Sequence, residues 1–342
     1  MKHPLRFLFV LFLIAPLLSN AQSHLIATEN YVTPRMRVII DNDLSGDPDG
    51  QFQLVHQLLS PSTQVCGVIG SHLNGHGFDG STKTATSAAA KAREIIGMMG
   101  LTGKVPVFEG SNEGMDTMTV AKDSEGARFI IKEAMRTDTK LPLYILCGAG
   151  LTNIASAWLM QPEIAKHITL VWIGGQEYDN ILPPPGYTIP EYNLNICIPA
   201  AQTIFNLSDI PLWQIPRNAY RQCCFSMAEM ENDVKPMGKI GAYLSKTIEE
   251  MISKLGSYGM GMGELYVLGD SPLTLLTALQ TGFEADPASS GSVIHAAPLI
   301  WKDGSYRYNP KGRTIRIFNQ IDTRLMFNDM TAKLKLFAPN NK

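Results

Sequence analysis

Residues 38–50 read VIIDNDLSGDPDG, an apolar run followed by four aspartates within nine positions: Asp41, Asp43, Asp47 and Asp49. Branched apolar residues ahead of Asp, Gly, Ser and Pro are typical of a buried strand that ends in a turn. Carboxylates this close repel one another, so folding alone does not favour such crowding. The turn is therefore either a solvated acidic loop or the binding site of a cation, and its composition alone leaves both open.

Short apolar runs alternate with helical patterns along the chain. We expect strands at 37–40, 64–69, 105–107, 141–146, 168–173, 212–215, 293–301 and 314–318, and helices at 51–59, 82–99, 124–135, 152–160, 199–205, 228–255, 270–279 and 322–336. Strand–helix alternation indicates parallel strands joined by crossover helices, so we predict an α/β fold with a doubly wound, mostly parallel sheet in a single domain. Ligands bind such sheets at the carboxyl ends of the strands, where the aspartate turn lies, and this favours the binding-site interpretation.

The first 21 residues have the pattern of a secretory signal peptide. Lys2 and Arg6 precede an apolar run at 7–18, and Ser-Asn-Ala follows at 19–21 as the cleavage site. The apolar run is too short for a membrane span, and an uncleaved anchor is the weaker alternative. We therefore expect a signal peptide at 1–21, an N-terminal extension at 22–36, a domain at 37–338 and an exported protein, periplasmic or secreted.

The whole chain has a formal net charge of −2 and 45% hydrophobic residues. This charge balance gives no electrostatic footprint for nucleic acid, while the hydrophobic content is enough to bury a large core. The five cysteines show neither a disulfide framework nor the spacing of a zinc site. We therefore expect no nucleic-acid partner and no structural zinc.

Further motifs follow the aspartate turn: VCGVIGSHLN (65–74), KVPVFEGS (104–111), CGAGLTNIASA (147–157), ITLVWIGG (168–175), EYNLNICIPAAQTIF (191–205), WQIPRNAYRQ (213–222), LGDSPLTLLTAL (268–279) and IDTRLMF (321–327). In this order, and together with DNDLSGDPDG at 41–50, they resemble the inosine–uridine-preferring nucleoside hydrolase superfamily over nearly all of residues 37–336. The resemblance implies a doubly wound α/β fold, one Ca²⁺ at the bottom of a ribose-shaped pocket, and hydrolysis of an N-glycosidic bond. We therefore expect Ca²⁺ as cofactor and a nucleoside or related ribosyl compound as substrate.

The chemistry that the resemblance implies accounts for the crowded aspartates. Ca²⁺ takes oxygen ligands from carboxylates, carbonyls and waters. A metal-bound water is more easily deprotonated, and a nearby carboxylate takes the proton. Attack at the anomeric carbon passes through an oxocarbenium-like state, which carboxylates stabilise. The aspartates of the turn are then crowded because they surround a cation.

The resemblance assigns the metal end of the pocket residue by residue. Asp43 matches a metal ligand that is also the general base, so it is the expected catalytic residue. Asp270 in GDSPL matches a remote aspartate that completes the metal shell, although an aspartate before Ser-Pro also serves as a helix cap. Asp47 is an additional aspartate in a longer turn, and Gly148 aligns with a position that offers only its backbone carbonyl. The expected metal-binding residues are Asp43, Asp47, Asp49, Gly148 and Asp270.

The sugar-binding side is assigned in the same way. Asp49 matches an aspartate that contacts ribose hydroxyls, and Glu191 and Asn193 in EYN match residues that hydrogen-bond the sugar. Asn74 falls where the family places another ribose-contacting asparagine. Taken singly, a Glu or Asn is more often a solvated loop residue. The expected substrate-binding residues are Asp49, Asn74, Glu191 and Asn193.

Three positions depart from the family pattern. Gly50 stands where a second metal-binding aspartate is usual, and Gly269 stands where a base-recognition histidine supplies the leaving-group acid. Pro185, in the insertion PPPGY, replaces an asparagine. The loop residues that are candidates to compensate are His72, His76, Tyr178 and Tyr187.

Because of these departures, two alternatives to a nucleoside hydrolase stay open. One is a noncatalytic ribose- or nucleoside-binding protein on the same fold, and the other is a hydrolase of another glycosyl bond. In each case we expect a small-molecule partner, with no membrane contact after removal of the signal peptide. A homo-oligomer is left open, as is the base that the substrate carries.

Overall fold

The structure is a computed structural model that describes residues 25–26, 28, 31–77, 80–178, 181–186, 190–280 and 290–340. The expected signal peptide at 1–21 lies outside the described residues, so export stays a prediction. Leu25 and Ile26, in the expected N-terminal extension, are buried in the core. The side chain of Arg35 donates to the carbonyl of Thr277 at 3.2 Å. Where it is described, the extension therefore packs against the domain.

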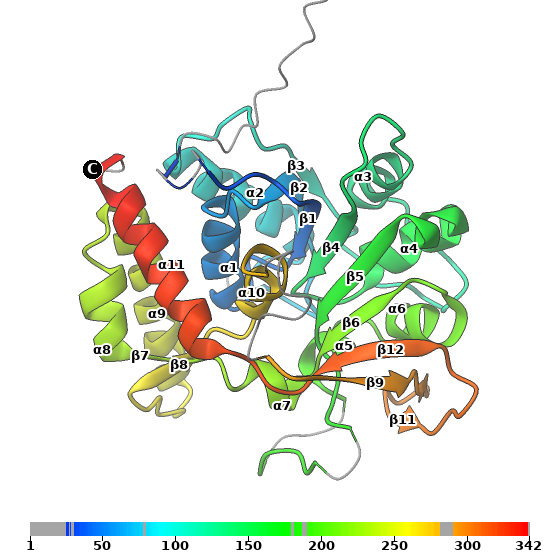
Figure 1. Ribbon diagram of the computed structural model, residues 1–342. Helices are drawn as coiled ribbons and strands as arrows, with labels where there is room; N and C mark the ends of the chain where they lie inside the picture. The colour runs from blue at the N-terminus through cyan, green and yellow to red at the C-terminus, as the bar shows by residue number, and fades with distance from the viewer. Residues whose placement is uncertain are drawn as a thin grey trace, which may run out of the picture.

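The described residues form a central sheet of eight strands in the order β3-β2-β1-β4-β5-β6-β12-β9 (Figure 1). All neighbours are parallel except β9, which runs antiparallel to β12. The strands are β1 (Met36–Asn42), β2 (Thr63–Gly70), β3 (Val107–Glu109), β4 (Leu143–Cys147), β5 (Ile168–Ile173), β6 (Leu212–Ile215), β9 (Ser292–Ala296) and β12 (Thr314–Phe318). The chain runs from β1 to one edge and then returns to β4 on the other side of β1. This reversal confirms the predicted doubly wound sheet.

β1 explains why the sheet has two covered faces. All of its residues are buried, and Val, Ile and Ile at its centre favour an extended, closely packed strand. Side chains alternate across a strand, so Val38 and Ile40 join one hydrophobic core while Ile39 joins the core on the opposite face. A parallel sheet of this kind is stable because helices cover both faces.

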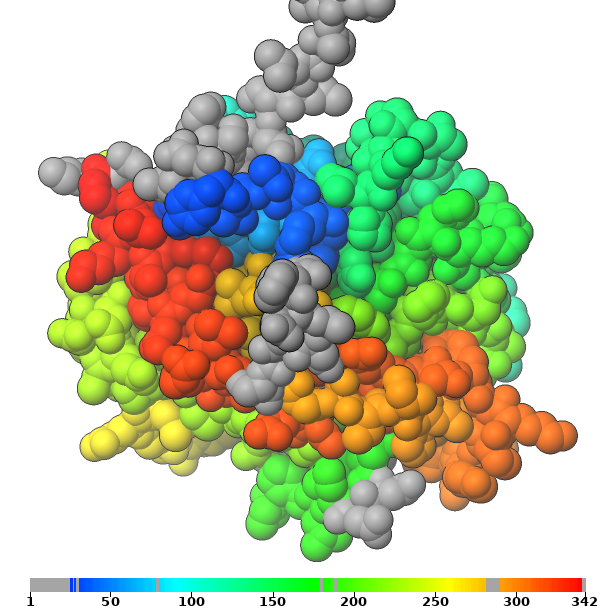
Figure 2. Space-filling view, in the orientation of Figure 1, coloured from blue at the N-terminus to red at the C-terminus, as the bar shows by residue number. Residues whose placement is uncertain are grey.

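The helices divide into two layers. One face is covered by α1 (Asp49–Leu58), α2 (Thr84–Met98), α9 (Gly238–Ser257), α10 (Pro272–Ala278) and α11 (Thr323–Phe337). The other is covered by α3 (Glu125–Ala134), α4 (Thr152–Met160), α5 (Tyr192–Ile196) and α6 (Ile198–Gln202). Figure 2 shows α11 (red) closing one flank of the molecule, where it packs on α1 and α10. No helix in the described part of the chain combines the length and apolar character that crossing a membrane requires.

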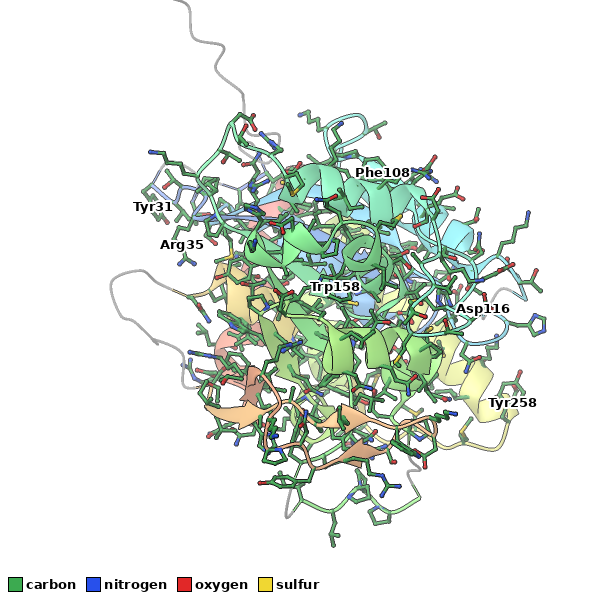
Figure 3. The ribbon with its side chains drawn as sticks, turned by 90° about the vertical axis from the view of Figure 1, so that its right-hand side faces the viewer. Tyr31, Arg35, Phe108, Asp116, Trp158 and Tyr258 are labelled. Carbon is green, nitrogen blue, oxygen red and sulfur yellow. The ribbon has the colours of Figure 1, made fainter. Side chains whose placement is uncertain are left out.

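Shorter elements complete the structure between β6 and α10 and near β9. These are α7 (Arg217–Tyr220), the hairpin of β7 (Cys224–Ser226) and β8 (Leu265–Val267), α8 (Met227–Glu229), and the hairpin of β10 (Leu299–Ile300) and β11 (Tyr306–Arg307). The 3₁₀ helices are Pro162–Lys166 and Ala338–Asn340, and the π-helical turns are Thr203–Leu207 and Met230–Val234. Figure 3 shows Tyr258, at the end of α9, on the opposite side of the molecule from Tyr31 and Arg35.

Most predicted elements are present, and the differences have local causes. The helix expected at 228–255 is interrupted, because Pro236 has no N–H to donate and α9 begins only at Gly238, whose φ is +67°. The strand expected at 293–301 divides into β9 and β10 around Pro298 for the same reason. The strand expected at 105–107 begins at Val107 instead.

A buried charged cluster joins α1 to α11. His56 is fully buried, and its Nε2 lies 2.7 Å from Oδ2 of Asp329. The same carboxylate oxygen lies 2.6 Å from Nζ of Lys333, which also donates to Oγ of Ser60 at 2.8 Å. Burial, the largest influence, lowers the pKa of His56 to about 4 from its ordinary value of 6.5. At neutral pH His56 is therefore a neutral ring that shares a hydrogen bond with Asp329.

This cluster predicts a loss of stability in acid. The pKa of His56 is lower in the folded chain than in the unfolded chain, so the stabilisation is complete above pH 6.5 and is lost as the pH falls towards 4. The slope that His56 contributes approaches about 1.4 kcal/mol per pH unit. His56→Gln should remove this slope from urea unfolding curves measured between pH about 7 and about 4. The exposed control His167→Gln should keep it, and equal slopes in wild type and His56→Gln would contradict the prediction.

Candidate active site

The aspartate turn lies where the strand order of the sheet reverses. At the end of β1, Asp41 is opposite Ile69 in β2 and Cys147 in β4. The strand ladders continue past these pairs, because Gly148 N donates to Asp41 O at 3.1 Å and Ser71 N donates to Asn42 O at 2.9 Å. The turn that follows is thus held between the ends of both neighbouring strands. In doubly wound sheets this is the position at which ligands bind.

A cavity of about 300 Å³ opens at this edge of the sheet. Asp43, Asp47, Asp49 and Asp270 line one part of it. Another part is lined by residues at the start of α5, at the end of α7 and at or just after the end of β8: Glu191, Tyr192, Asn193, Tyr220, Arg221, Val267 and Gly269. Segments far apart in the sequence therefore meet around one cavity, and four of the five predicted metal-binding residues are the aspartates of its acidic part. The fifth, Gly148, also lines it.

Hydrogen bonds hold the carboxylates of Asp47, Asp49 and Asp270 in place. Asn42 Nδ2 donates to Oδ2 of Asp270 at 2.9 Å, and the backbone N of Asp270 donates to Oδ2 of Asp49 at 3.1 Å. Oδ1 of Asp47 accepts from the hydroxyl of Tyr266 at 3.0 Å. Asp270, at the start of the α10 segment, is thereby tied to the end of β1. Nothing in the local sequence marks Asn42, because its partner lies 228 positions away.

In the acidic part of the cavity, burial and mutual repulsion disfavour the charged form of the carboxylates. Asp43 and Asp270 are buried, Asp49 is half-buried, and Asp47 lies exposed at the rim. Burial raises the pKa of Asp43 well above its ordinary value, and repulsion from Asp270 and Asp47 raises it further. Burial is also the main cause of the raised pKa of Asp270. A cation among these carboxylates would remove much of this penalty.

The donor set has the chemistry of a hard-cation site. Carboxylate and carbonyl oxygens are the ligands that Ca²⁺ takes. Oδ1 of Asn42 is buried with no hydrogen-bond partner among the described atoms. A Cβ at Gly148 would lie 2.5 Å from both Asn42 Nδ2 and Asp270 Oδ2, so the missing side chain leaves room for Asp270. As they lie, no three His, Cys, Asp or Glu side chains of the described residues form a metal-holding group. The donors therefore fit Ca²⁺ by chemistry, and the assembled ion site stays a prediction.

Gly50 is also explained by its surroundings. A Cβ at this position would lie 2.7 Å from Oδ1 of Asn42. The side chain of Asn42 therefore fills the space that the usual second aspartate would need. Because Gly50 has no side chain, Asn42 has room to lie against Asp270.

The two predicted sugar-binding residues of the EYN motif lie at the cavity. Glu191 is buried and caps α5, accepting from the backbone N of Asn193 at 3.1 Å and of Leu194 at 3.0 Å. It also accepts from Gly175 N at 2.7 Å and from the hydroxyl of Tyr220 at 2.9 Å. Nδ2 of Asn193 donates to the carbonyl of Ile173 at 2.8 Å. Both side chains are held by the protein itself, which fixes this wall of the cavity.

Asn74 and the proposed compensating residues lie elsewhere. Asn74 is exposed, does not line the cavity, and donates to the carbonyl of Asn195 at 3.0 Å, so its contact with ribose stays a prediction. His72 is buried with Nε2 at 2.8 Å from Oγ1 of Thr152, and His76 is exposed. Tyr178 contacts Gln214 through its hydroxyl. None of these three lines the cavity, and Tyr187 lies outside the described residues.

Tyr220 takes the space beside Gly269. A Cβ at Gly269 would lie 3.3 Å from Cδ2 of the Tyr220 ring and 3.3 Å from Oδ2 of Asp49. α7, which carries Tyr220, is anchored by Arg217, whose Nε and Nη2 pair with the two oxygens of Glu177 at 2.7 and 2.6 Å. Both of these side chains are almost fully buried. The motif WQIPRNAYRQ does not indicate which of its residues line the cavity, so Tyr220 and Arg221 could not be predicted from it.

The fold and the cavity define an α/β protein with a doubly wound sheet and an acidic site at its switch point. A family model described as inosine-uridine preferring nucleoside hydrolase matches residues 38–297, and the chain belongs to this family. It is a hydrolase that acts on the N-glycosidic bond of nucleosides. A comparison by sequence with curated proteins gives no match.

Solved structures with nucleoside hydrolase names share the fold. A plant nucleoside hydrolase, PpNRh1, superposes with a TM-score of 0.65 at 16% identity, covering 88% of this chain and 99% of that one. The purine-preferring ribonucleoside hydrolase from Gardnerella vaginalis and the inosine-uridine preferring nucleoside hydrolase from Bacillus anthracis each give a TM-score of 0.63 at 18% identity, with the same coverage of 88% and 99%. At these identities the likeness shows the arrangement of the chain and leaves substrate preference undetermined.

The close packing around Gly148 gives a test of the site's architecture. Gly148→Ala should lower the free energy of unfolding by about 1–3 kcal/mol, because its Cβ would press on Asn42 and Asp270. The control is Gly97→Ala on the exposed side of α2, where a Cβ would meet only Thr102 Oγ1 at 3.6 Å. There alanine should raise stability by up to about 1 kcal/mol through its better helix propensity. Urea unfolding measures both, and a Gly148→Ala protein as stable as wild type would show that Asp270 is not confined.

Proposed function

We propose that the chain is a Ca²⁺-dependent hydrolase of N-glycosidic bonds in nucleosides or related ribosyl compounds. The observation that carries the proposal is the group of Asp43, Asp49 and Asp270, which the fold brings together around a cavity at the switch point. Family membership supports the reaction, and the oxygen-only donor set supports Ca²⁺ over softer metals. We also propose, on the residues of the N-terminal segment alone, that the protein is exported.

The residues that would hold the ion are Asp43, Asp47, Asp49, Asp270 and the carbonyl of Gly148. When bound there, Ca²⁺ supplies a Lewis acid that lowers the pKa of water. Asp43 is the general base, because its carboxylate lies in the cavity among the residues that would hold the ion and can accept a proton from water there. Asp49 and Asn193 face the same cavity and can orient ribose hydroxyls, while Glu191 keeps Asn193 and Tyr220 in place.

Departure of the leaving group is the demanding half of this reaction. Gly269 offers no proton, and the hydroxyl of Tyr220 already donates to Glu191. His72, His76 and Tyr178 lie away from the cavity. The pocket therefore favours substrates whose leaving group departs without general-acid help. A noncatalytic ribose-binding protein on the same fold is the alternative, favoured by the missing leaving-group acid at Gly269.

Ca²⁺ should stabilise the folded protein if the acidic residues bind it. An ion that binds only the folded state at 100 times its Kd adds about 2.7 kcal/mol, which raises the melting temperature. Asp270→Ala should abolish the shift, whereas Asp116→Ala, at an exposed carboxylate paired with Lys122, should keep it. The measurement is thermal unfolding with chelator and with millimolar Ca²⁺. Identical melting curves in wild type would reject Ca²⁺ binding.

Catalysis is tested by comparing an activated riboside with natural nucleosides. General-acid help is typically worth a factor of about 10²–10⁴, so a nitrophenyl riboside should be cleaved that much faster than inosine or uridine. Asp43→Asn should remove activity on both, because it takes away the base. Release of nitrophenolate and of ribose gives the rates. Equal turnover of inosine would mean that another group supplies the proton, and binding of ribose without any cleavage would favour the noncatalytic alternative.

A further inference from the structure

Asp47 differs from the other carboxylates of the cavity in its surroundings. Asp43 and Asp270 are buried and Asp49 is half-buried, whereas Asp47 lies exposed at the rim. It belongs to the turn LSGDP at 44–48, and ordering an exposed side chain on such a turn costs conformational entropy. Asp47 can therefore contribute to an ion site only if another group restricts the rotation of its side chain.

Two donors restrict the carboxylate of Asp47 at one of its oxygens. Oδ1 accepts from the hydroxyl of Tyr266 at 3.0 Å and from the backbone N of Asp49 at 3.2 Å. Oδ2 accepts no hydrogen bond from the described residues. The side chain is thus oriented through Oδ1, and Oδ2 is left for another partner.

Tyr266 can orient Asp47 because it is itself firmly placed. It is 4% exposed and lies in the same hydrophobic core as Phe225, its partner across the β7–β8 hairpin. The hydroxyl of a buried tyrosine usually finds a hydrogen-bond partner, and here that partner lies 219 positions away, on the acidic turn. The next residue, Val267, lines the cavity. This hydrogen bond therefore joins the acidic turn to the hairpin wall of the cavity.

We propose that Tyr266 is a positioning residue, which holds the carboxylate of Asp47 in place as a ligand for the ion. The inference rests on the proposed Ca²⁺-dependent function and identifies a residue that sets the affinity of its ion site. It also makes ion binding depend on the β7–β8 hairpin, which carries none of the expected metal-binding residues.

A tyrosine hydroxyl is chemically suited to this task. It donates one hydrogen bond without adding a charge, so Asp47 keeps its negative charge for a cation. A lysine or arginine in the same place would compete with the ion for the carboxylate. Hydrogen bonds to the ligands of a metal orient those ligands, and removing one typically lowers metal affinity about 10–100-fold.

Calorimetric titration of the purified protein with Ca²⁺ tests the proposal. Tyr266→Phe should raise the Kd for Ca²⁺ about 10–100-fold, and Asp47→Ala should raise it at least as much. The double variant should bind no more weakly than Asp47→Ala, because Tyr266 acts through Asp47. The control Tyr243→Phe removes a hydroxyl that donates to Glu94 at 3.3 Å on an exposed surface, and it should bind Ca²⁺ as wild type does.

The titration also shows which results would overturn the proposal. An unchanged Kd in Tyr266→Phe would mean that the hydroxyl orients no ligand. Losses that add in the double variant would mean that Tyr266 acts without Asp47. Absence of Ca²⁺ binding in wild type would reject both this inference and the Ca²⁺ dependence of the proposed function.

Two further measurements separate positioning from a purely structural role and from the hydrolase proposal. A melting temperature that falls in chelator while the Kd of Tyr266→Phe stays unchanged would indicate a structural role only. The Ca²⁺ concentration for half-maximal cleavage of a nitrophenyl riboside should rise by the same factor as the Kd, and saturating Ca²⁺ should restore the rate. If wild type binds Ca²⁺ but cleaves no riboside, the hydrolase proposal fails, while the ratio of the Kd values still decides the role of Tyr266.

Discussion

Repulsion among carboxylates that the fold encloses at the carboxyl end of β1 is the constraint on which the rest of the structure depends. Asp41 and Asp43 come from the strand and its turn, and Asp270 is brought to them from the distant start of the α10 segment. The strands and helices around these aspartates pack in the two hydrophobic cores, and that packing stabilises the fold. Neighbouring amides compensate part of this charge, because Asn153 Nδ2 in α4 donates to Asp41 Oδ1 at 2.9 Å and Asn42 in β1 donates to Asp270. The acidic cluster is held in place at the edge of a sheet whose two faces are fully packed.

The two ends of the cavity are built in different ways. The acidic end comes largely from one short segment, so its residues are placed by the local geometry of a strand leading into a helix. The opposite wall comes from α7, the β7–β8 hairpin and the residues before α10, which meet only through tertiary packing. The ring of Tyr220 and the absent side chain of Gly269 fit together across that junction. A change at one of these two positions therefore changes the space available at the other.

The features that depend on local sequence could be predicted, and those that depend on tertiary packing could not. The strands and helices could be predicted because branched apolar runs and helical periodicity are local, and the aspartate turn was identified by its composition and by its place after β1. Asn42 and Tyr220 were not, since their importance comes from partners far away in the chain. Asn74 was assigned by position in a motif, yet its side chain is exposed and bonded to Asn195. Motif position alone does not determine which way a loop asparagine points.

The carboxylate of Glu191 joins the loop after β5, the start of α5 and the end of α7 through four hydrogen bonds. A single buried group thus sets the relative positions of three segments before any ligand arrives. The wall is preorganised. A sugar that binds there loses its own translational and rotational freedom, but the protein loses little further conformational entropy. The shape of this side of the cavity is therefore already set in the free protein. A ligand binds here only if its own shape matches that preformed surface.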